Sequence, residues 1–136
     1  MNVIVFACVH NAGRSQMAAA FFNAEADPAK ARATSAGTQP GDRVHAEVVA
    51  VMGEIAIDLS AVRPQRLTEQ LAGTARLLVT MGCGESCPFV PGVERLDWAI
   101  ADPKDQSTER VREIRDEIRA RVRHLVGSRG WSRQSG

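Results

Sequence analysis

The chain has 136 residues, of which 44% are hydrophobic and 4% aromatic, and it contains no tyrosine. A chain of this length is expected to fold as one domain with a sizeable buried core. Its 17 basic and 16 acidic residues give a formal net charge of +1, so no broad field attracts nucleic acid or an anionic membrane. Any anion that the protein binds must therefore be held by local groups.

The start of the chain lacks both the basic segment and the long apolar core of a signal peptide. The longest apolar run, residues 3–9, is too short to span a bilayer. We therefore expect a cytoplasmic protein. Because cytoplasmic thiols are kept reduced, the three cysteines are expected to be reactive, metal-binding or simply buried, rather than a permanent disulfide framework.

Predicted strands and predicted helices alternate along the chain. The hydrophobic pattern predicts strands at 2–7, 32–36, 75–81 and 94–98, and helices at 15–23, 44–52, 65–71 and along an apolar stripe from 111 to 125. This alternation predicts an α/β fold in which an open four-stranded parallel sheet is flanked by helices. The single domain is expected to cover residues 1–126, and the Ser-, Gly- and Arg-rich residues 127–136 are expected to form a flexible tail.

The loop after the first predicted strand separates Cys8 from Arg14 by five residues, with Ser15 next. A loop of this length, leading into a helix, can surround a tetrahedral oxyanion with backbone N–H groups. Arg14 can hold two oxygens of that anion, and the positive surroundings favour the thiolate of Cys8. The alternative is that Cys8 is an inert buried thiol. The predicted anion-binding residues are Val9, His10, Asn11, Ala12, Gly13, Arg14 and Ser15.

Asp102 and Pro103 lie in the loop after the fourth predicted strand. A carboxylic acid on a loop can protonate an oxygen that leaves during displacement, and a following proline stiffens the loop. Asp102 is therefore a candidate general acid, with Asp105 as a less favoured substitute. An ordinary Asp-Pro turn is the alternative.

Cys83 and Cys87 lie in the loop after the third predicted strand, with three residues between them. This is not the Cys-x-x-Cys spacing of zinc knuckles or common redox motifs, and four zinc ligands are hard to find, so we expect no metal site. Two thiols near a nucleophilic thiolate suit serial disulfide exchange. The alternative is that both are incidental loop cysteines.

The combination of the Cys8–Arg14 loop with Asp102-Pro103 resembles the low-molecular-weight tyrosine phosphatase family. With cysteines after the third strand, the sequence is similar to the arsenate reductases of this family that are coupled to thioredoxin. The resemblance implies that Asp102 is the general acid, that arsenate is the substrate with phosphate or sulfate as competitors, and that no cofactor is bound. The matching stretches are 8–18, 35–37, 79–88 and 97–103.

The resemblance also implies a reaction order. Cys8 attacks arsenic while Asp102 protonates the departing oxygen; Cys83 then attacks Cys8 and arsenite leaves; Cys87 attacks Cys83, and thioredoxin reduces the final disulfide. Some relatives use a small thiol such as mycothiol instead, and two neighbouring thiols favour thioredoxin. Ala19 stands where some relatives place a glutamate that helps to bind potassium, so a potassium site is not expected.

Two other functions compete with this interpretation. A tyrosine phosphatase needs a cleft with aromatic walls and usually has tyrosine after Asp-Pro, whereas this chain has Lys104 there. An arsenite or metal sensor could use Cys8, Cys83 and Cys87 as a three-thiolate site. Such a regulator would need a DNA-binding helix pair or a basic patch, and the sequence shows neither.

Overall fold

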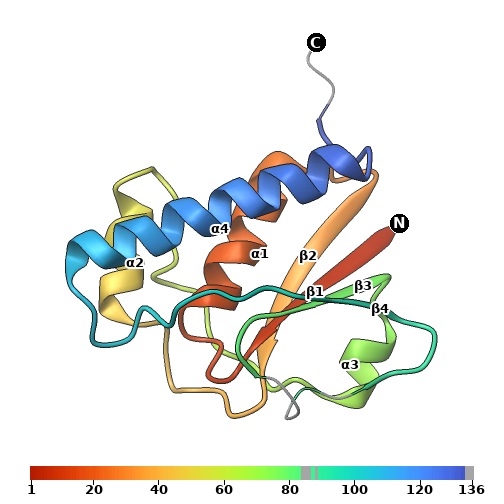
Figure 1. Cartoon of the computed structure of the whole chain (residues 1–136), viewed down its shortest axis with the longest axis horizontal. Helices are drawn as coiled ribbons and strands as arrows, with labels where there is room; N and C mark the ends of the chain where they lie inside the picture. Colours follow the sequence, from red (N-terminus) through yellow and green to blue (C-terminus); the bar gives the residue numbers. More distant parts are fainter. Residues whose placement is uncertain (84–86, 88, 134–136) are drawn as a thin grey trace.

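The computed structural model describes residues 1–83, 87 and 89–133. The elements are β1 (Asn2–Cys8), α1 (Arg14–Glu25), β2 (Ala31–Gly37), α2 (Ala46–Gly53), α3 (Glu69–Gly73), β3 (Leu77–Thr80), β4 (Glu94–Asp97) and α4 (Thr108–Ser128). The sheet order is β2-β1-β3-β4, and each neighbouring pair is parallel (Figure 1). The predicted α/β fold with a four-stranded parallel sheet is therefore confirmed.

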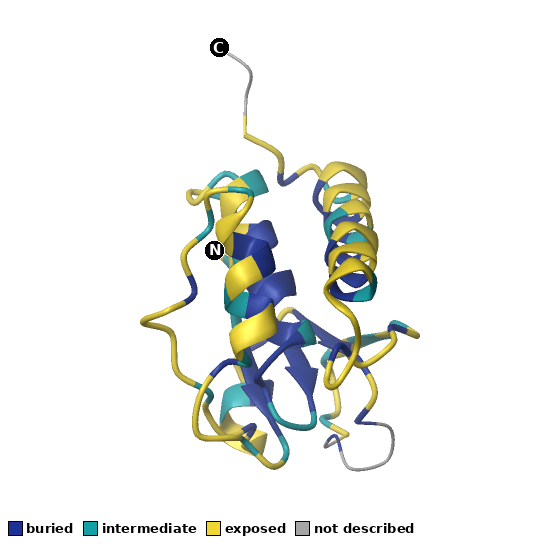
Figure 2. Cartoon of the chain, turned by 90° about the vertical axis from the view of Figure 1, so that its left-hand side faces the viewer, coloured by how far each residue is buried: buried dark blue, intermediate teal, exposed yellow. Residues whose placement is uncertain are grey.

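Alternate residues of β1 point to opposite faces of the sheet, as in any strand. Ile4, Phe6 and Cys8 pack into a large apolar cluster with α1, α2 and α4. Val5 and Ala7 pack into a smaller cluster on the other face, next to α3. The buried sides of the helices accordingly turn inward, while their outer sides are exposed (Figure 2). This two-sided burial explains why β1 reads as a continuous apolar run.

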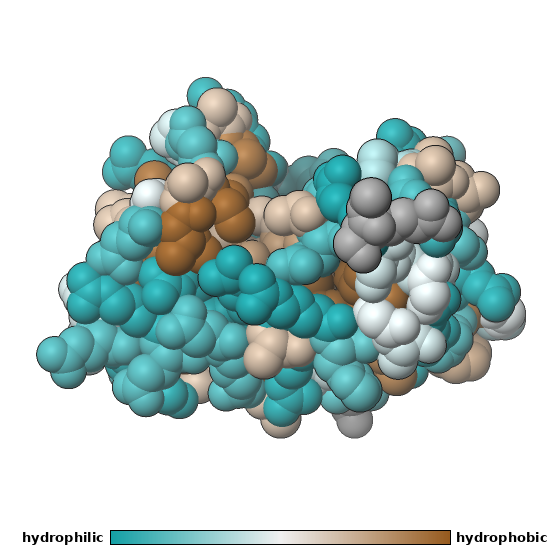
Figure 3. Space-filling view, turned by 90° about the horizontal axis from the view of Figure 1, so that it is seen from above, coloured by the Kyte–Doolittle hydropathy of each residue, from teal (hydrophilic) through white to brown (hydrophobic). Residues whose placement is uncertain are grey.

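α4 covers one face of the domain with the apolar stripe that the sequence predicted. Its buried residues include Val111, Ile114, Ile118, Val122 and Leu125. The Ser107 hydroxyl caps the helix by accepting a hydrogen bond from the Arg110 N–H. The surface seen from the side of α4 is mainly hydrophilic (Figure 3). No helix in the described part of the chain, α4 included, is both long and apolar enough to cross a membrane.

The end of the domain differs from the prediction. α4 continues to Ser128, so the boundary predicted at residue 126 lies inside a helix. Trp131 is buried against Phe22, with ring centroids 5.9 Å apart, and Ser132 forms a β-bridge with Ala26. The burial of one large aromatic ring outweighs the polar composition of this segment. Of the predicted flexible tail, residues 134–136 lie outside the described residues.

The segment before α3 also differs from the prediction, which began a helix at residue 65. Here Gly37 of β2 donates its N–H to the Gln65 carbonyl and accepts from the Leu67 N–H, so this stretch is extended. Thr68 then caps α3 by accepting from the Leu71 N–H. The pairing with β2 takes up the backbone groups that a helix would have used.

A side chain of α1 also forms hydrogen bonds with the outer edge of β2. Asn23 donates from Nδ2 to the Ala33 carbonyl at 3.0 Å and accepts from the Ala33 N–H at 2.8 Å. Its amide thus satisfies both outward backbone groups of that residue.

Candidate active site

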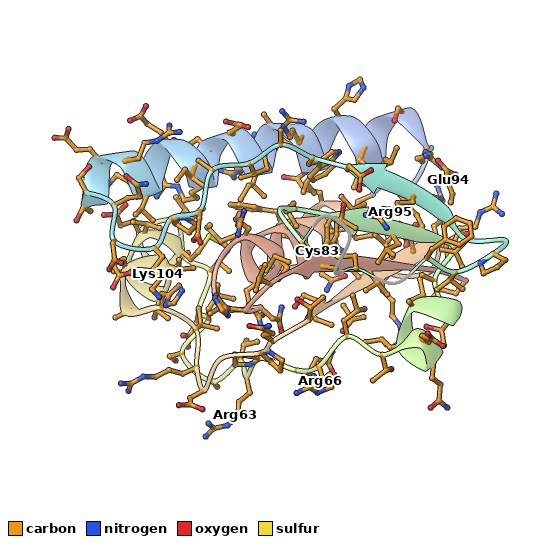
Figure 4. The ribbon with its side chains drawn as sticks, turned by 60° about the horizontal axis from the view of Figure 1, so that its bottom comes forward. Arg63, Arg66, Cys83, Glu94, Arg95 and Lys104 are labelled. Carbon is orange, nitrogen blue, oxygen red and sulfur yellow. A yellow bond between two sulfur atoms is a disulfide. The ribbon has the colours of Figure 1, made fainter. Side chains whose placement is uncertain are left out.

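Three loops follow the carboxyl ends of β1, β3 and β4 and meet at one end of the sheet. β1 ends at Cys8 and α1 begins at Arg14, so these two residues flank the loop predicted to bind an anion. Figure 4 brings this end forward, with Cys83 near the centre and Lys104 and Arg66 on surrounding loops. Parallel sheets bind their ligands at this edge.

The carbonyl groups of the Cys8–Arg14 loop are held by the loop after β2. The N–H groups of Thr38 and Gln39 donate to the carbonyls of Cys8 and Val9, and His45 N–H donates to the Ala12 carbonyl. In a trans peptide the following N–H points the opposite way from the carbonyl. The N–H groups after these carbonyls are therefore directed away from the 38–45 loop, which is the arrangement that binds an anion.

Gly37 allows the two loops to approach each other. A Cβ at this position would lie 2.6 Å from the Val9 carbonyl oxygen and 2.9 Å from the Asn11 nitrogen. Any side chain here would therefore push the anion loop away. His10, also in the predicted binding set, lies on the outer side, with Nδ1 3.0 Å from the Gln39 carbonyl oxygen.

Cys8 is 3% exposed, and its Sγ lies 2.8 Å from the Ser15 Oγ. Ser15 accepts a hydrogen bond of 2.7 Å from Asn11 Nδ2, and both residues are fully buried. A hydroxyl hydrogen directed at sulfur favours the thiolate, which is the nucleophilic form. The structure places the Ser15 hydroxyl beside the sulfur of Cys8, the candidate nucleophile, and anion binding by Ser15 stays a prediction.

Asn11 has the left-handed backbone conformation, with φ of +51°, which asparagine tolerates better than most residues. Its Oδ1 accepts from the Gln65 N–H at 2.9 Å and from Gln16 Nε2 at 3.1 Å. Sequence reasoning did not single out Gln16 or Gln65. A polar residue among the buried residues of α1 was the available signal for Gln16, while Gln65 is 54 positions from Asn11 and gave none.

Arg14 is oriented by the loop that carries the candidate acid. Its Nη1 donates to the Ile100 carbonyl at 3.1 Å, and its Nη2 lies 3.7 Å from Asp102 Oδ2. The Arg14 side chain is 11% exposed and that of Asp102 49%, so the acid faces solvent while the cation is nearly enclosed. Asp102 Oδ1 accepts from the Lys104 N–H, which fixes the carboxylate in a tight turn.

Two glycines and a proline shape the space around Arg14. Gly82 has φ of +89°, and a Cβ on it would lie 3.1 Å from the Arg14 Cζ and closer still to Nη1. A Cβ on Gly13 would lie 3.0 Å from Cγ of Pro103. The Asp102 loop is therefore packed directly on the anion loop, and Arg14 occupies space that only glycine at position 82 leaves free.

The ends of β3 and β4 are joined where their loops begin. Asp97 accepts hydrogen bonds from the Thr80 hydroxyl and from Arg95 Nε. The bond from Thr80, together with that from Arg95, lowers the pKa of the Asp97 carboxyl below its usual value. This contact fixes the start of the loop that carries Cys83 relative to the start of the loop that carries Asp102.

Cys83 and Cys87 form a disulfide, with Cα atoms 5.5 Å apart, and Cys8 is free. Both disulfide cysteines are buried in the smaller apolar cluster with Val5 and Leu78, on the face of the sheet opposite to the cluster that holds Cys8. Within the described residues, no group of three or more His, Cys, Asp or Glu side chains could hold a metal ion. The residues between the two cysteines lie outside the described part of the chain.

The fold and the site define an α/β protein with a buried cysteine at the end of the first strand, joined by a short loop to an arginine at the start of the first helix. Residues 3–134 match the family model of the low molecular weight phosphotyrosine protein phosphatases. The chain belongs to this family.

Relatives in this family carry the names of reductases. A protein from Halobacterium salinarum, named "Putative arsenate reductase", is 42% identical over 121 residues, covering 86% of this chain and 85% of that protein. A protein from Synechocystis, named "Glutaredoxin arsenate reductase", is 31% identical over 129 residues, covering 93% and 97%.

A solved structure gives the same comparison in three dimensions. The thioredoxin-dependent arsenate reductase of Corynebacterium glutamicum superposes with a TM-score of 0.81 at 35% identity, covering 94% of this chain. The present chain spans 61% of the length of that protein.

Proposed function

We propose that this protein reduces arsenate to arsenite, with Cys8 as the nucleophile. The observation that carries the proposal is the Cys83–Cys87 disulfide at the same end of the sheet as the Cys8–Arg14 loop. Hydrolysis of a phosphate ester requires one thiolate and an acid, and it gives no role to a second and third thiol. Reduction requires two electrons, which a pair of thiols supplies when it becomes a disulfide. The names of the relatives support the same substrate.

In the first stage, the anion loop and Arg14 hold arsenate and the Cys8 thiolate attacks arsenic. A sulfur–arsenic bond forms, and one arsenic–oxygen bond breaks. The oxygen leaves as water once Asp102 supplies a proton. Asp102 is suited to this because its carboxylate lies 3.7 Å from the guanidinium that holds the oxyanion and remains open to solvent, from which it regains its proton.

In the second stage, the Cys83 thiolate attacks the Cys8 sulfur. The sulfur–arsenic bond breaks, and its electron pair stays on arsenic, which leaves as arsenite. The two sulfurs are oxidised to a Cys8–Cys83 disulfide. Cys87 then attacks Cys83 and releases Cys8 as a thiolate, which leaves the Cys83–Cys87 disulfide. The bond found in the structure is the one expected at the end of this sequence, with Cys8 again free.

The relay requires Cys83 to change its position. Cys83 packs on the α3 face of the sheet and Cys8 on the opposite face, so the two sulfurs must meet around the carboxyl end of β1. The loop after β3 begins at this end, next to Gly82 and Arg14, which makes the required path short.

Thioredoxin is the proposed reductant. An intramolecular disulfide is reduced most directly by an external dithiol, which forms a mixed disulfide and then resolves it within itself. The name of the Corynebacterium protein supports thioredoxin, while the name of the Synechocystis protein indicates glutaredoxin. A small thiol such as mycothiol is the third possibility to be tested.

The proposal is tested by arsenate-dependent oxidation of NADPH with thioredoxin and thioredoxin reductase. Parallel assays replace these with glutaredoxin and glutathione, or with mycothiol, and a fourth assay measures hydrolysis of p-nitrophenyl phosphate. Turnover that depends on thioredoxin supports the full proposal. Fast ester hydrolysis without arsenate reduction would instead identify a phosphatase.

The relay is tested separately with variants in which one of the three cysteines is replaced by serine. We expect Cys8→Ser to produce no arsenite and Cys87→Ser to produce about one arsenite per enzyme before it stops with Cys8 and Cys83 joined. Mass spectrometry of the digested Cys87→Ser protein detects that linkage. Catalytic arsenite formation by this variant, with free thiols throughout, would mean that an external thiol attacks Cys8 directly.

A further inference from the structure

Asn11, Ser15 and Gln16 form a buried polar row behind the nucleophile. Asn11 and Ser15 are 0% exposed and Gln16 is 4% exposed, so solvent does not compete for their hydrogen bonds. The row begins at the backbone of Gln65, which donates to Asn11 at 2.9 Å, and ends at the sulfur of Cys8. The groups that lead to Cys8 in this row, a backbone N–H, an amide and a hydroxyl, are all neutral.

The direction of the hydrogen bonds in this row is fixed by its first member. A backbone N–H can donate but cannot accept, so the Asn11 atom facing Gln65 must be the oxygen of its amide. The nitrogen of the same amide must then face Ser15 and donate to its hydroxyl oxygen at 2.7 Å. A hydroxyl has one hydrogen, and here that hydrogen is left for the Cys8 sulfur at 2.8 Å.

We propose that Gln16 is a positioning residue that, together with the Gln65 N–H, keeps the Asn11 amide in this orientation. Its Nε2 lies 3.1 Å from the Asn11 backbone carbonyl oxygen and 3.1 Å from Asn11 Oδ1. One amide nitrogen thus holds both oxygens of a residue whose backbone is left-handed. With Gln16 in place, the Asn11 amide has two donors on its oxygen, and the Ser15 hydrogen is directed to Cys8.

Replacing the Gln16 amide with a carboxylate should reverse the direction of the hydrogen bonds between Asn11 and Ser15. Burial and the two facing oxygens of Asn11 raise the pKa of the new acid in Gln16→Glu, so the repulsion arises at pH values where its carboxylate is ionised. Turning the Asn11 amide over relieves one of these contacts, at the cost of the hydrogen bond from Gln65, and presents the amide oxygen to Ser15. The Ser15 hydrogen then goes to Asn11, and Cys8 loses its donor. Gln16→Met removes the amide without adding an acceptor, and the Gln65 N–H still holds the Asn11 oxygen.

The experiment measures the Cys8 thiol itself, because this role of Gln16 rests on the proposed nucleophilic role of Cys8. With the Cys83–Cys87 disulfide intact, Cys8 is the sole free thiol of the three cysteines. Its alkylation by iodoacetamide is followed as a function of pH, without arsenate, in the wild type, Ser15→Ala, Gln16→Glu, the double variant and Gln16→Met. Failure of arsenate reduction would therefore leave this result unaffected.

We expect Ser15→Ala to slow alkylation about 10-fold or more at mildly acidic pH, and Gln16→Glu to do so at pH values where its buried carboxylate is ionised, since each removes a hydrogen bond to a charged group. Their pH profiles should move to higher pH. The double variant should match Ser15→Ala, because the glutamate acts through a hydroxyl that is already absent. Gln16→Met should slow alkylation by about 3-fold, less than Gln16→Glu, because the Gln65 N–H alone then holds the Asn11 oxygen.

Additive effects in the double variant would overturn the proposal, because they would mean that the new carboxylate acts on Cys8 by its charge alone. An unchanged profile in Gln16→Glu, or equal effects of Gln16→Glu and Gln16→Met, would overturn it as well. If Gln16→Glu does not fold, Asn11→Asp replaces it, alone and combined with Ser15→Ala. Aspartate tolerates the left-handed backbone and also presents an oxygen to Ser15.

Discussion

Replacing Gly82 with alanine should disable the site through Arg14. The residue has φ of +89°, so a Cβ adds backbone strain of about 1–2 kcal/mol. The same Cβ would lie 3.1 Å from the Arg14 Cζ and closer to Nη1, so the guanidinium must move away from its bond to the Ile100 carbonyl. A misplacement of about 1 Å in a group that holds the substrate can cost about 100-fold in rate. We therefore expect kcat/KM for arsenate to fall by about this factor.

Gly92 provides a matched control. Its φ is +85°, almost the same as that of Gly82, but a Cβ there meets no atom within 4 Å. Gly92→Ala should therefore show the same strain, about 1–2 kcal/mol in the free energy of unfolding measured with urea, without a large change in kcat/KM. Equal losses of activity in the two variants would refute the reasoning, because strain alone would then explain both. Full activity in Gly82→Ala would do so as well.

Two further predictions concern acids. Asp102→Asn should slow formation of the arsenic–sulfur adduct by about 100-fold or more and flatten its pH–rate profile, as measured by rapid quench; an unchanged profile would point to Asp105. Arg112, and to a lesser extent Arg115, lower the pKa of Glu54 below its usual value, so this carboxylate stabilises the folded state at neutral pH and the gain is lost as the pH falls through the lowered pKa. Glu54→Gln should therefore lose less stability on acidification in urea titrations than the wild type.

The strand-to-helix loop at Cys8 could be predicted from sequence because its signals are local. An apolar run, a cysteine, an arginine six positions later and a helix-forming segment all lie within one short stretch. The apolar stripe of α4 was predictable for the same reason, since a helix repeats its buried positions every three or four residues. In both cases the physical cause and the residues that show it are neighbours in the chain.

The parts that could not be predicted depend on distant partners. Trp131 is buried because Phe22, from another helix, lies against it, and no nearby residue indicates this. Gln65 is extended because its carbonyl accepts from the Gly37 N–H and its own N–H donates to Asn11 Oδ1. The hydrogen-bonded row behind Cys8 likewise needs a backbone N–H from position 65. The sequence contains these residues but does not indicate which of them are in contact in the folded protein.

The outer edge of β2 is closed by groups that do not belong to any strand. Asn23 pairs with both backbone groups of Ala33, the Gln65 side chain donates to the Ser35 carbonyl, and backbone groups of residues 65 and 67 pair with Gly37. An open parallel edge normally offers free N–H and C=O groups on which strands of other molecules can assemble into aggregates. At Ala33, at the Ser35 carbonyl and at Gly37 that template is already occupied, so these contacts protect the β2 edge of the sheet from self-association.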